Sequence, residues 1–271
     1  MLRATILGIG LWGPGLFGWR EGRAVLAGAN PFAHAEAKPP APLLLPANER
    51  RRAGPAVRLA LGVAEAAVAM ARNDHPALDP ATLRAVFASS NGEGAVVDDL
   101  LKTLADPTEA VGVSPTQFHN SVHNVAAGYW SIAHGGRAPA DSLAAHDATF
   151  AAGLLKALAE TVAEASPVLF CLFDAPLPFP LGACRRTDFA FGMALVLAPQ
   201  ASGAGALGQI AARFDPRDAA LDRPHAPALA ALVDGNPAAQ SLALLEVLAR
   251  GEHRHLAAPL TTGHLRLEVT P

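Results

Sequence analysis

Cysteine is scarce in this sequence: Cys171 and Cys184 are the only two among 271 residues. Two thiols are too few for a disulfide framework or a cysteine-based metal cluster, and they favour a reducing, cytoplasmic setting. Charge is scarce as well. Charged residues make up 17% of the chain and the net charge is −3, so neither nucleic acid nor an anionic membrane surface is an expected partner.

Long apolar runs are also missing. No stretch of about 20 uninterrupted apolar residues occurs, so we expect no membrane span. Pro14 and several glycines break the apolar N-terminus, and Arg3 is the one positive charge ahead of it. No small-residue cleavage pattern follows, and we therefore expect no signal peptide.

The composition is that of a globular protein, 51% hydrophobic, in which apolar runs alternate with segments of helical spacing. The apolar runs predict strands at residues 2–8, 83–89, 140–145, 166–175, 187–199, 206–213 and 264–269. The helical spacing predicts helices at 19–27, 56–72, 95–105, 115–133, 147–164, 226–233 and 238–250. Strands that are apolar throughout favour an α/β fold with a mostly parallel mixed sheet between helices. A Gly/Ala/Ser run at 200–206 predicts a boundary between residues 1–199 and a smaller region, 200–271, packed on the same domain.

Two motifs suggest a ligand but have simpler structural explanations. GIGLWG at residues 8–13 fits the dinucleotide-binding pattern G-x-G-x-x-G, but Pro14 and Gly15 interrupt the point where the helix should begin. A tight turn is favoured instead. His119 and His123 are four apart in an expected helix, yet the glutamate of H-E-x-x-H is absent, so packing is favoured. We therefore expect neither a cofactor nor a metal.

The cysteines and a basic run carry weaker signals. Cys171 lies inside an apolar run, as an inert core residue does. Cys184 stands beside Arg185 and Arg186, whose charge can activate a thiol, but no base lies at a useful spacing. The basic run at residues 50–52 is either a solvated surface or a contact for a phosphate or an acidic partner.

Residues 118–150 read FHNSVHNVAAGYWSIAHGGRAPADSLAAHDATF. This pattern predicts a helix, a turn, a buried strand and the sharp start of a second helix. It places Asp147 at the strand-to-helix junction, where a fold of this kind can present one side chain at the mouth of a pocket. A carboxylate at a helix start accepts backbone N–H bonds, a cap worth ~1 kcal/mol, and this is the favoured role of Asp147.

Four segments resemble the thiolase-fold β-ketoacyl synthases and stand in the family's order. They are ATILGIGLWGPGLFGWREGRAVLAG, VFASSNGEG, NVAAGYWSIAHGGRAPADSLAAHD and DFAFGMALVLAP, and they span roughly residues 1–199. LLPANERRRAGPAVRLAL further resembles the chain-length-factor subgroup of aryl polyene and related type II polyketide pathways. The resemblance implies a thiolase-like fold whose first half is retained and whose second half, residues 200–271, is abbreviated.

The resemblance also places Asp147 where an active ketosynthase has its nucleophilic cysteine. That chemistry requires a thiolate that accepts the acyl chain as a thioester, whereas a carboxylate would form a labile anhydride. The family's second half supplies the histidines that drive decarboxylation and condensation, but His253, His255 and His264 match neither of its histidine motifs. Condensation by this chain alone is therefore not expected.

What the resemblance implies is a non-catalytic, chain-length-factor-like subunit. It would form a heterodimer with an active β-ketoacyl synthase in polyene, polyketide or fatty-acyl assembly on an acyl carrier protein. The family dimerises through the elements around the nucleophile, so the interface is expected within residues 115–150. The large side chains there are Phe118, Val122, Tyr129, Trp130 and Phe150.

Other partners and roles stay open. Arg50, Arg51 and Arg52 are expected to contact the acidic carrier protein or the partner subunit. An alternative is a stand-alone enzyme acting on acyl thioesters through Asp147 and a nearby histidine. A further alternative is a homodimeric scaffold without an acyl ligand.

Overall fold

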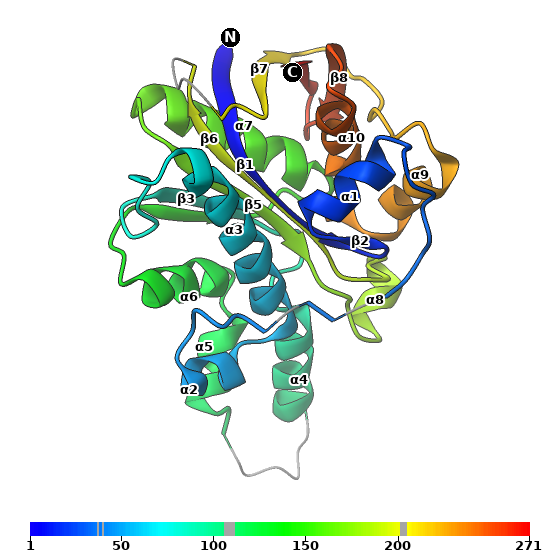
Figure 1. Cartoon of the computed structure of the whole chain (residues 1–271). Helices are drawn as coiled ribbons and strands as arrows, with labels where there is room; N and C mark the ends of the chain where they lie inside the picture. The colour runs from blue at the N-terminus through cyan, green and yellow to red at the C-terminus, as the bar shows by residue number, and fades with distance from the viewer. Residues whose placement is uncertain (37, 40, 106–111, 201–204) are drawn as a thin grey trace.

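The computed structural model describes residues 1–36, 38–39, 41–105, 112–200 and 205–271, which build a nine-stranded sheet with helices on both faces (Figure 1). The strands are β1 (Leu2–Gly13), β2 (Leu16–Phe17), β3 (Arg84–Ala88), β4 (Ala140–Leu143), β5 (Val168–Asp174), β6 (Phe191–Pro199), β7 (Gly208–Asp215), β8 (Arg254–Pro259) and β9 (His264–Thr270). The α-helices are α1 (Trp19–Leu26), α2 (Ala47–Arg52), α3 (Pro55–Asp74), α4 (Gly94–Ala105), α5 (Pro115–Ser121), α6 (Val125–His134), α7 (Thr149–Ala163), α8 (Leu181–Cys184), α9 (Pro227–Gly235) and α10 (Leu242–Arg250). Two 3₁₀ turns, η1 (His146–Ala148) and η2 (Pro237–Ser241), precede α7 and α10.

The strand order across the sheet is β4-β3-β5-β6-β1-β7-β9-β8, with β2 paired to β1. Among the described strands only the β3–β4 and β3–β5 pairs are parallel, and the other pairs are antiparallel. The α/β class and the mixed sheet expected from the sequence are confirmed, but the expectation of a mostly parallel sheet is wrong. Strands that are apolar throughout indicate helices on both faces, and here antiparallel strands are covered in the same way.

The GIGLWG motif lies within β1, not in the tight turn that the sequence favoured. A Cβ atom on Gly8 would lie 2.0 Å from the carbonyl oxygen of Ala67, and one on Gly10 would lie 1.9 Å from that of Val63. The two glycines therefore let the backbone of α3 pack directly against the strand. The turn follows the motif and joins β1 to β2.

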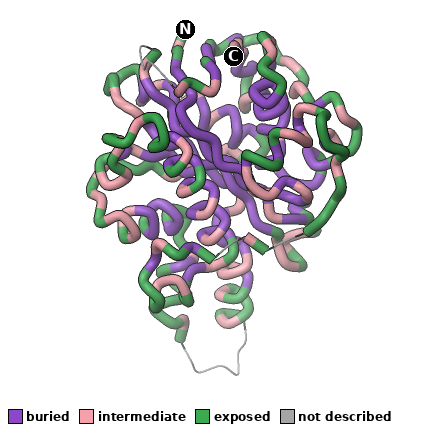
Figure 2. Tube along the Cα trace, in the orientation of Figure 1, coloured by how far each residue is buried: buried purple, intermediate pink, exposed green. Residues whose placement is uncertain are grey.

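The core has two layers, one on each face of the sheet. The first lies between the sheet and helices α3 and α6, and Cys171 belongs to it. The second lies between the opposite face and α1, α7, η2 and α10. Figure 2 shows the buried residues running along the central strands and the helix faces that cover them.

One predicted helix is divided in two in the structure, and the edge strand β8 is not predicted. Residues 115–133, expected as one helix, form α5 and α6, because Val122 adopts an extended conformation that ends α5. α5 begins with a capping box in which Ser114 and Gln117 each accept the other's backbone N–H. β8 is not among the strands that the sequence predicts; in the structure it is an edge strand in which Leu256 and Ala258 are buried.

The C-terminal region continues the same sheet, because β7 pairs with β1 and β9 with β7. Residues 201–204, the middle of the expected boundary at 200–206, lie outside the described residues. The division into a ketosynthase-like half, 1–199, and a reduced region, 200–271, stays a prediction.

A lobe of helices α2, α4 and α5 projects from the sheet (Figure 1). α4 packs against α5, and its buried residues are limited to Gly94 and Asp98. The apolar side chains of Leu101, Leu104 and Phe118 are exposed on this lobe. None of the described helices is long and apolar enough to cross a bilayer.

Candidate functional site

The junction between β4 and α7 is a sharp turn that presents its side chains outward. His146, the first residue of η1, has φ 51°, a left-handed conformation that costs energy in a residue other than glycine. The Thr149 hydroxyl holds the turn: it donates to the carbonyl oxygen of His146 at 2.6 Å and accepts the N–H of Ala145 at 3.0 Å. The junction that the sequence predicts is therefore present.

Asp147 lies at this junction but does not cap the helix. Its carboxylate accepts a hydrogen bond from Arg185 Nη2 at 2.7 Å and lies 3.2 Å from His146 Nδ1. Among the described residues, no side chain caps α7, whose N-cap residue is Ala148. The predicted capping role is wrong, because the carboxylate binds the side chain of Arg185, 38 positions further along the chain.

Around Asp147 is a cavity of about 250 Å³ with mainly polar walls. It is lined by His146, Asp147, Cys184, Arg185, Arg186, Val233, Asp234, Asn236, Pro237 and Gln240. The Asp147 side chain is 70% exposed and the Arg185 side chain 14% exposed. The ion pair therefore lies at the mouth of the cavity, with the guanidinium group of Arg185 buried more deeply than the carboxylate. The lining combines two arginines, two carboxylates, two amides and one imidazole, a set that suits a small polar group.

Asp174, at the end of β5, is the deepest acid near this site. Its side chain accepts hydrogen bonds from the Ser89 hydroxyl at 2.8 Å and the Asn91 backbone N–H at 3.1 Å. Burial raises its pKa from 3.8 to about 6, although these bonds and the Arg185 charge act in the opposite direction. Asn236, which lines the cavity, donates to the Asp174 carbonyl oxygen at 3.1 Å. The cavity wall is thus tied to the end of the central strands.

A second buried acid, Glu93, lies where α4 begins. Its carboxylate accepts the backbone N–H of Val57 at 2.7 Å and so caps α3. Burial raises its pKa from 4.5 to about 7, against the lowering effect of these backbone bonds and of Arg58. An acid just before α4 is also favoured by the dipole of that helix, but the hydrogen bond of Glu93 is to a different helix, α3.

The predicted interface side chains divide into two groups. Phe118 and Val122 are 64% and 36% exposed. Tyr129, Trp130 and Phe150 are 1%, 3% and 3% exposed and lie in the core of the chain itself, because α6 and α7 cover opposite faces of the sheet. These three supply no exposed contact surface, and an interface in this region stays a prediction that depends on Phe118 and Val122.

The histidines of this region make structural contacts. His123 lies between α5 and α6 with Nε2 3.0 Å from the Ser89 carbonyl oxygen, and His119 packs edge-on against Tyr129. They do not share a helix, so the two-histidine metal face considered from the sequence is absent from these described residues. His134 packs against Trp130 with the ring centroids 4.1 Å apart and the ring planes tilted by 57°.

The cysteines differ in their surroundings. Cys171 is fully buried in β5, its Sγ donates to the Ala60 carbonyl oxygen at 3.5 Å, and burial raises its pKa well above the ordinary value. Cys184, on α8, is exposed and lines the same cavity as Asp147. A thiol therefore adjoins the site without occupying the junction.

The basic run lies on α2 in the projecting lobe. Arg51 donates to the Asn48 side chain, and Arg52 pairs with Glu49 at 3.4 Å. The Arg52 carbonyl oxygen accepts from Asn120 Nδ2 at 2.8 Å, which ties α2 to α5. Arg51 and Arg52 are exposed and Arg50 is half-buried, so a contact with an acidic partner stays a prediction.

Sequence reasoning missed Arg185 as a site residue, and it missed Asp174 and Asn236 entirely. The sequence presents Arg185 only as a neighbour of Cys184. Asp174 carried a usable signal, because it is a single carboxylate at the end of the continuous apolar run VLFCLFD. Asn236 carries no such signal, since its contacts lie 47 and 62 positions away.

Comparison with known proteins bears on the fold. The family model described as the N-terminal domain of beta-ketoacyl synthase matches residues 26–258. A chain of the complex of the ketosynthase ApeO with its chain length factor ApeC, from Xenorhabdus doucetiae, superposes with a TM-score of 0.69 at 22% identity over 100% of both chains. A chain of the ishigamide ketosynthase/chain length factor superposes with a TM-score of 0.68 at 17% identity over 99% of both chains.

A further neighbour is a chain of AntDE:AntF, a type II PKS acyl-carrier protein in complex with its ketosynthase bound to the hexaketide. It superposes with a TM-score of 0.74 at 13% identity over 99% of both chains. No curated protein sequence matches the chain. At these identities the likeness establishes the fold, and it confirms the thiolase-like ketosynthase fold implied by the four sequence segments.

Proposed function

Because the chain belongs to the β-ketoacyl synthase N-terminal-domain family, we propose that it is a ketosynthase-like subunit without condensing activity of its own. In this proposal it forms a heterodimer with an active β-ketoacyl synthase, as a chain length factor does, and borders the tunnel that holds the growing acyl chain. Two neighbours in fold contain a ketosynthase with a chain length factor, and another contains a ketosynthase with its acyl carrier protein. Those neighbours support the same partners here, in cytoplasmic assembly of a polyene, polyketide or fatty-acyl chain.

The observation that carries this proposal is the carboxylate at the β4–α7 junction. The resemblance assigns this position to the nucleophile, and here Asp147 is held between Arg185 and His146. An ion-paired carboxylate is a weak nucleophile, and its acyl adduct would be an anhydride open to water. Cys171 cannot replace it, because that thiol is fully buried within β5.

The cavity beside the junction supports a bordering role. Its volume is about 250 Å³, and it is lined by charged and amide side chains such as Arg186, Asp234 and Gln240. A long apolar chain threaded there would desolvate these groups without giving them hydrogen-bond partners, which is unfavourable. The proposal therefore assigns the acyl tunnel itself to the partner subunit.

The open edge of the sheet supports pairing in the predicted region. β4 is an edge strand within residues 115–150 and pairs only with β3 among the described strands. Edge strands with free backbone groups are templates for pairing with another chain. Phe118 and Val122 add exposed apolar side chains elsewhere in residues 115–150. Arg51 and Arg52 on α2 would meet the acidic carrier protein or the partner.

Co-expression tests the proposal. The chain is produced with a full-length β-ketoacyl synthase and acyl carrier protein from the same gene neighbourhood. We expect a stable one-to-one complex with the ketosynthase on size-exclusion chromatography, and a change in product length when this chain is left out. Failure to co-purify together with an unchanged product would refute the proposal.

Acyl transfer gives an independent check. The purified chain is incubated with acylated carrier protein and its intact mass is measured, beside the Cys184→Ser variant. We expect no acyl adduct on either protein. An adduct that disappears in the Cys184→Ser variant would show that the exposed thiol carries acyl groups, and the subunit would then not be silent.

A second candidate function is a stand-alone enzyme acting on acyl thioesters. One contact favours it: His146 Nδ1 lies 3.2 Å from Asp147 Oδ2, and the two side chains are 76% and 70% exposed. Such a pair can move a proton at a bound thioester. Thioester hydrolysis by the purified chain decides between the two. Turnover that is lost in Asp147→Asn but kept in Cys184→Ser favours the enzyme, whereas no turnover in the unaltered chain favours the subunit.

A further inference from the structure

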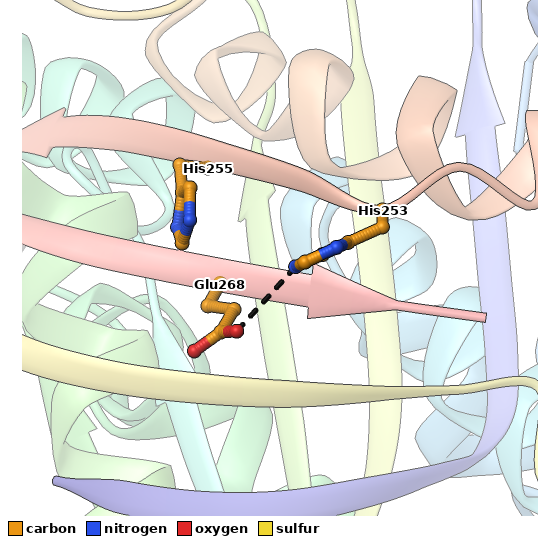
Figure 3. Close-up of side chains that lie close together, drawn as sticks. All are labelled: His253, His255 and Glu268. Carbon is orange, nitrogen blue, oxygen red and sulfur yellow. Dashed lines mark ion pairs between the residues drawn. The ribbon is translucent and has the colours of Figure 1, made fainter.

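His253, His255 and Glu268 lie together on the open face of the β8–β9 hairpin (Figure 3). His255 is on β8, and His253 is two positions before it. Side chains two apart along an extended chain point to the same face. The opposite face of the hairpin carries buried residues such as Leu256 and Leu267, so the imidazoles point away from the core.

The register of the hairpin places Glu268 directly across from His255. The bond from the Leu260 N–H to the Gly263 carbonyl oxygen closes the hairpin. Counting the alternation of the ladder from it makes His255 and Glu268 a non-hydrogen-bonded pair, the type in which cross-strand side chains lie closer. Two paired strands thus hold His255 and Glu268 face to face, and the residue just before β8 adds His253.

The distances are near those of a metal centre. His253 Nε2 lies 3.4 Å from Glu268 Oε1, and the two imidazole centroids are 5.7 Å apart. One ligand atom from each of the three residues lies within 4.8 Å of the others. Tetrahedral zinc, with bonds of about 2.0–2.2 Å, holds its ligand atoms about 3.3 Å apart. Rotation of the exposed side chains can close the difference, since His253 is 57% exposed and Glu268 29%.

We propose that His253, His255 and Glu268 bind a divalent transition metal of the zinc class. Two imidazole nitrogens and one carboxylate oxygen are ligands that such ions prefer, and three protein ligands leave a fourth position for water. The site is independent of the proposed subunit role. The ketosynthase resemblance gives none of the three residues a function, and β8 lies at the opposite end of the sheet from β4.

Nearby positive charge sets the expected strength of the site. Arg213 and Arg266 line a hollow of about 170 Å³ together with His255, Glu268 and Met1. Their charges disfavour a cation. Within the described part of the chain, however, Glu268 has its ion pair with His253 and none with either arginine. We therefore expect moderate affinity, sufficient for one ion per chain.

Metal titration of the untagged full-length chain, freed of metal by a chelator, tests the proposal. We expect calorimetry to detect one saturable Zn²⁺ site, and Co²⁺ to give the absorption bands of a tetrahedral centre. His253→Ala, His255→Ala and Glu268→Gln should each weaken Zn²⁺ binding by about tenfold or more. His34→Ala is the matched control, because His34 is also exposed and faces a carboxylate, Glu36, at 4.0 Å.

Two readouts separate loss of the site from loss of folding. In the presence of chelator the variants and the unaltered chain should melt at the same temperature. Added Zn²⁺ should raise the melting temperature of the unaltered chain and of His34→Ala but not of His255→Ala, because the ion binds the native hairpin. No saturation below about 100 µM Zn²⁺, or equal affinity in the unaltered chain and His255→Ala, overturns the proposal.

Discussion

Two buried carboxyl groups, Glu93 and Asp174, make stability depend on pH. Their pKa values rise from 4.5 to about 7 and from 3.8 to about 6, mainly through burial. Below the pKa values of the unfolded chain, 4.5 and 3.8, both carboxyl groups are protonated in the folded and in the unfolded state. In that pH range their full contribution to the free energy of unfolding is present. As pH rises, the unfolded chain loses these protons first, so the free energy of unfolding falls until the folded pKa is passed.

Denaturant unfolding at a series of pH values measures this effect at Glu93. The free energy of unfolding should fall between about pH 5 and pH 7, with a contribution of about 3 kcal/mol from Glu93. Glu93→Gln keeps an oxygen that can accept the Val57 N–H but cannot ionise, so its pH slope should be shallower. Asp174→Asn serves as the matched variant for the other acid. An unchanged slope in Glu93→Gln would contradict the assignment.

At the residue scale, the sequence predicts where a side chain lies along an element better than what it contacts. The alternation of apolar runs places Asp147 at the strand-to-helix junction, and the structure has it there. Its partner Arg185 comes from a loop after α8, and local periodicity carries no information about such a contact. Tyr129 and Trp130 show the same limit, because large side chains at a predicted interface are equally suited to a core.

At the element scale, the packing of α3 on β1 depends on glycine. A methyl group at Gly10 would meet the Val63 carbonyl oxygen at 1.9 Å, and neither backbone can move without disturbing the centre of the sheet. Gly10→Ala should therefore destabilise the chain by about 3 kcal/mol or more. Gly128→Ala is the control, since α6 leaves open space around Gly128, and it should stabilise the chain by about 1 kcal/mol.

Chemical denaturation compares these two variants directly. The expected result is opposite shifts in the unfolding midpoint at an unchanged dependence on denaturant. If Gly10→Ala were as stable as the unaltered chain, close packing would not be the reason for glycine in β1.

The elements themselves are well predicted where their pattern is strong. The continuous run that forms β5 and the helical spacing of α3 both appear as expected, within a few residues. Strand direction is not predicted, because it depends on which strands meet in the sheet. The break between α5 and α6 is also missed, since Val122 is an apolar residue that fits a continuous helix and ends it only through its backbone conformation.

At the scale of the whole molecule, the two edges of the sheet differ. At the β8 edge, the Asp222 side chain accepts the outward N–H of Ala257 at 2.7 Å, and the Asp222 N–H donates to the Ala257 carbonyl oxygen at 3.1 Å. The β8 edge is therefore paired with another segment of the chain at Ala257. At the β4 edge, the carbonyl oxygens of Pro139 and Leu143 accept N–H groups at the two ends of β3. Because the backbone groups of successive residues in a strand point to alternate sides, those of Ser142 point outward, away from β3.

The outward N–H of Ser142 gives a specific test of the proposed pairing. Ser142→Pro removes that donor but leaves the bonds to β3 in place, and proline is tolerated at a sheet edge. If a partner strand pairs here, one carbonyl group of that strand has no donor in the Ser142→Pro complex. The free energy of binding should then weaken by about 1–3 kcal/mol, or roughly tenfold in affinity or more. Ser142→Ala, which keeps the N–H, should bind the ketosynthase normally. Equal affinity of the two variants, measured by calorimetry on folded proteins, would place the interface elsewhere.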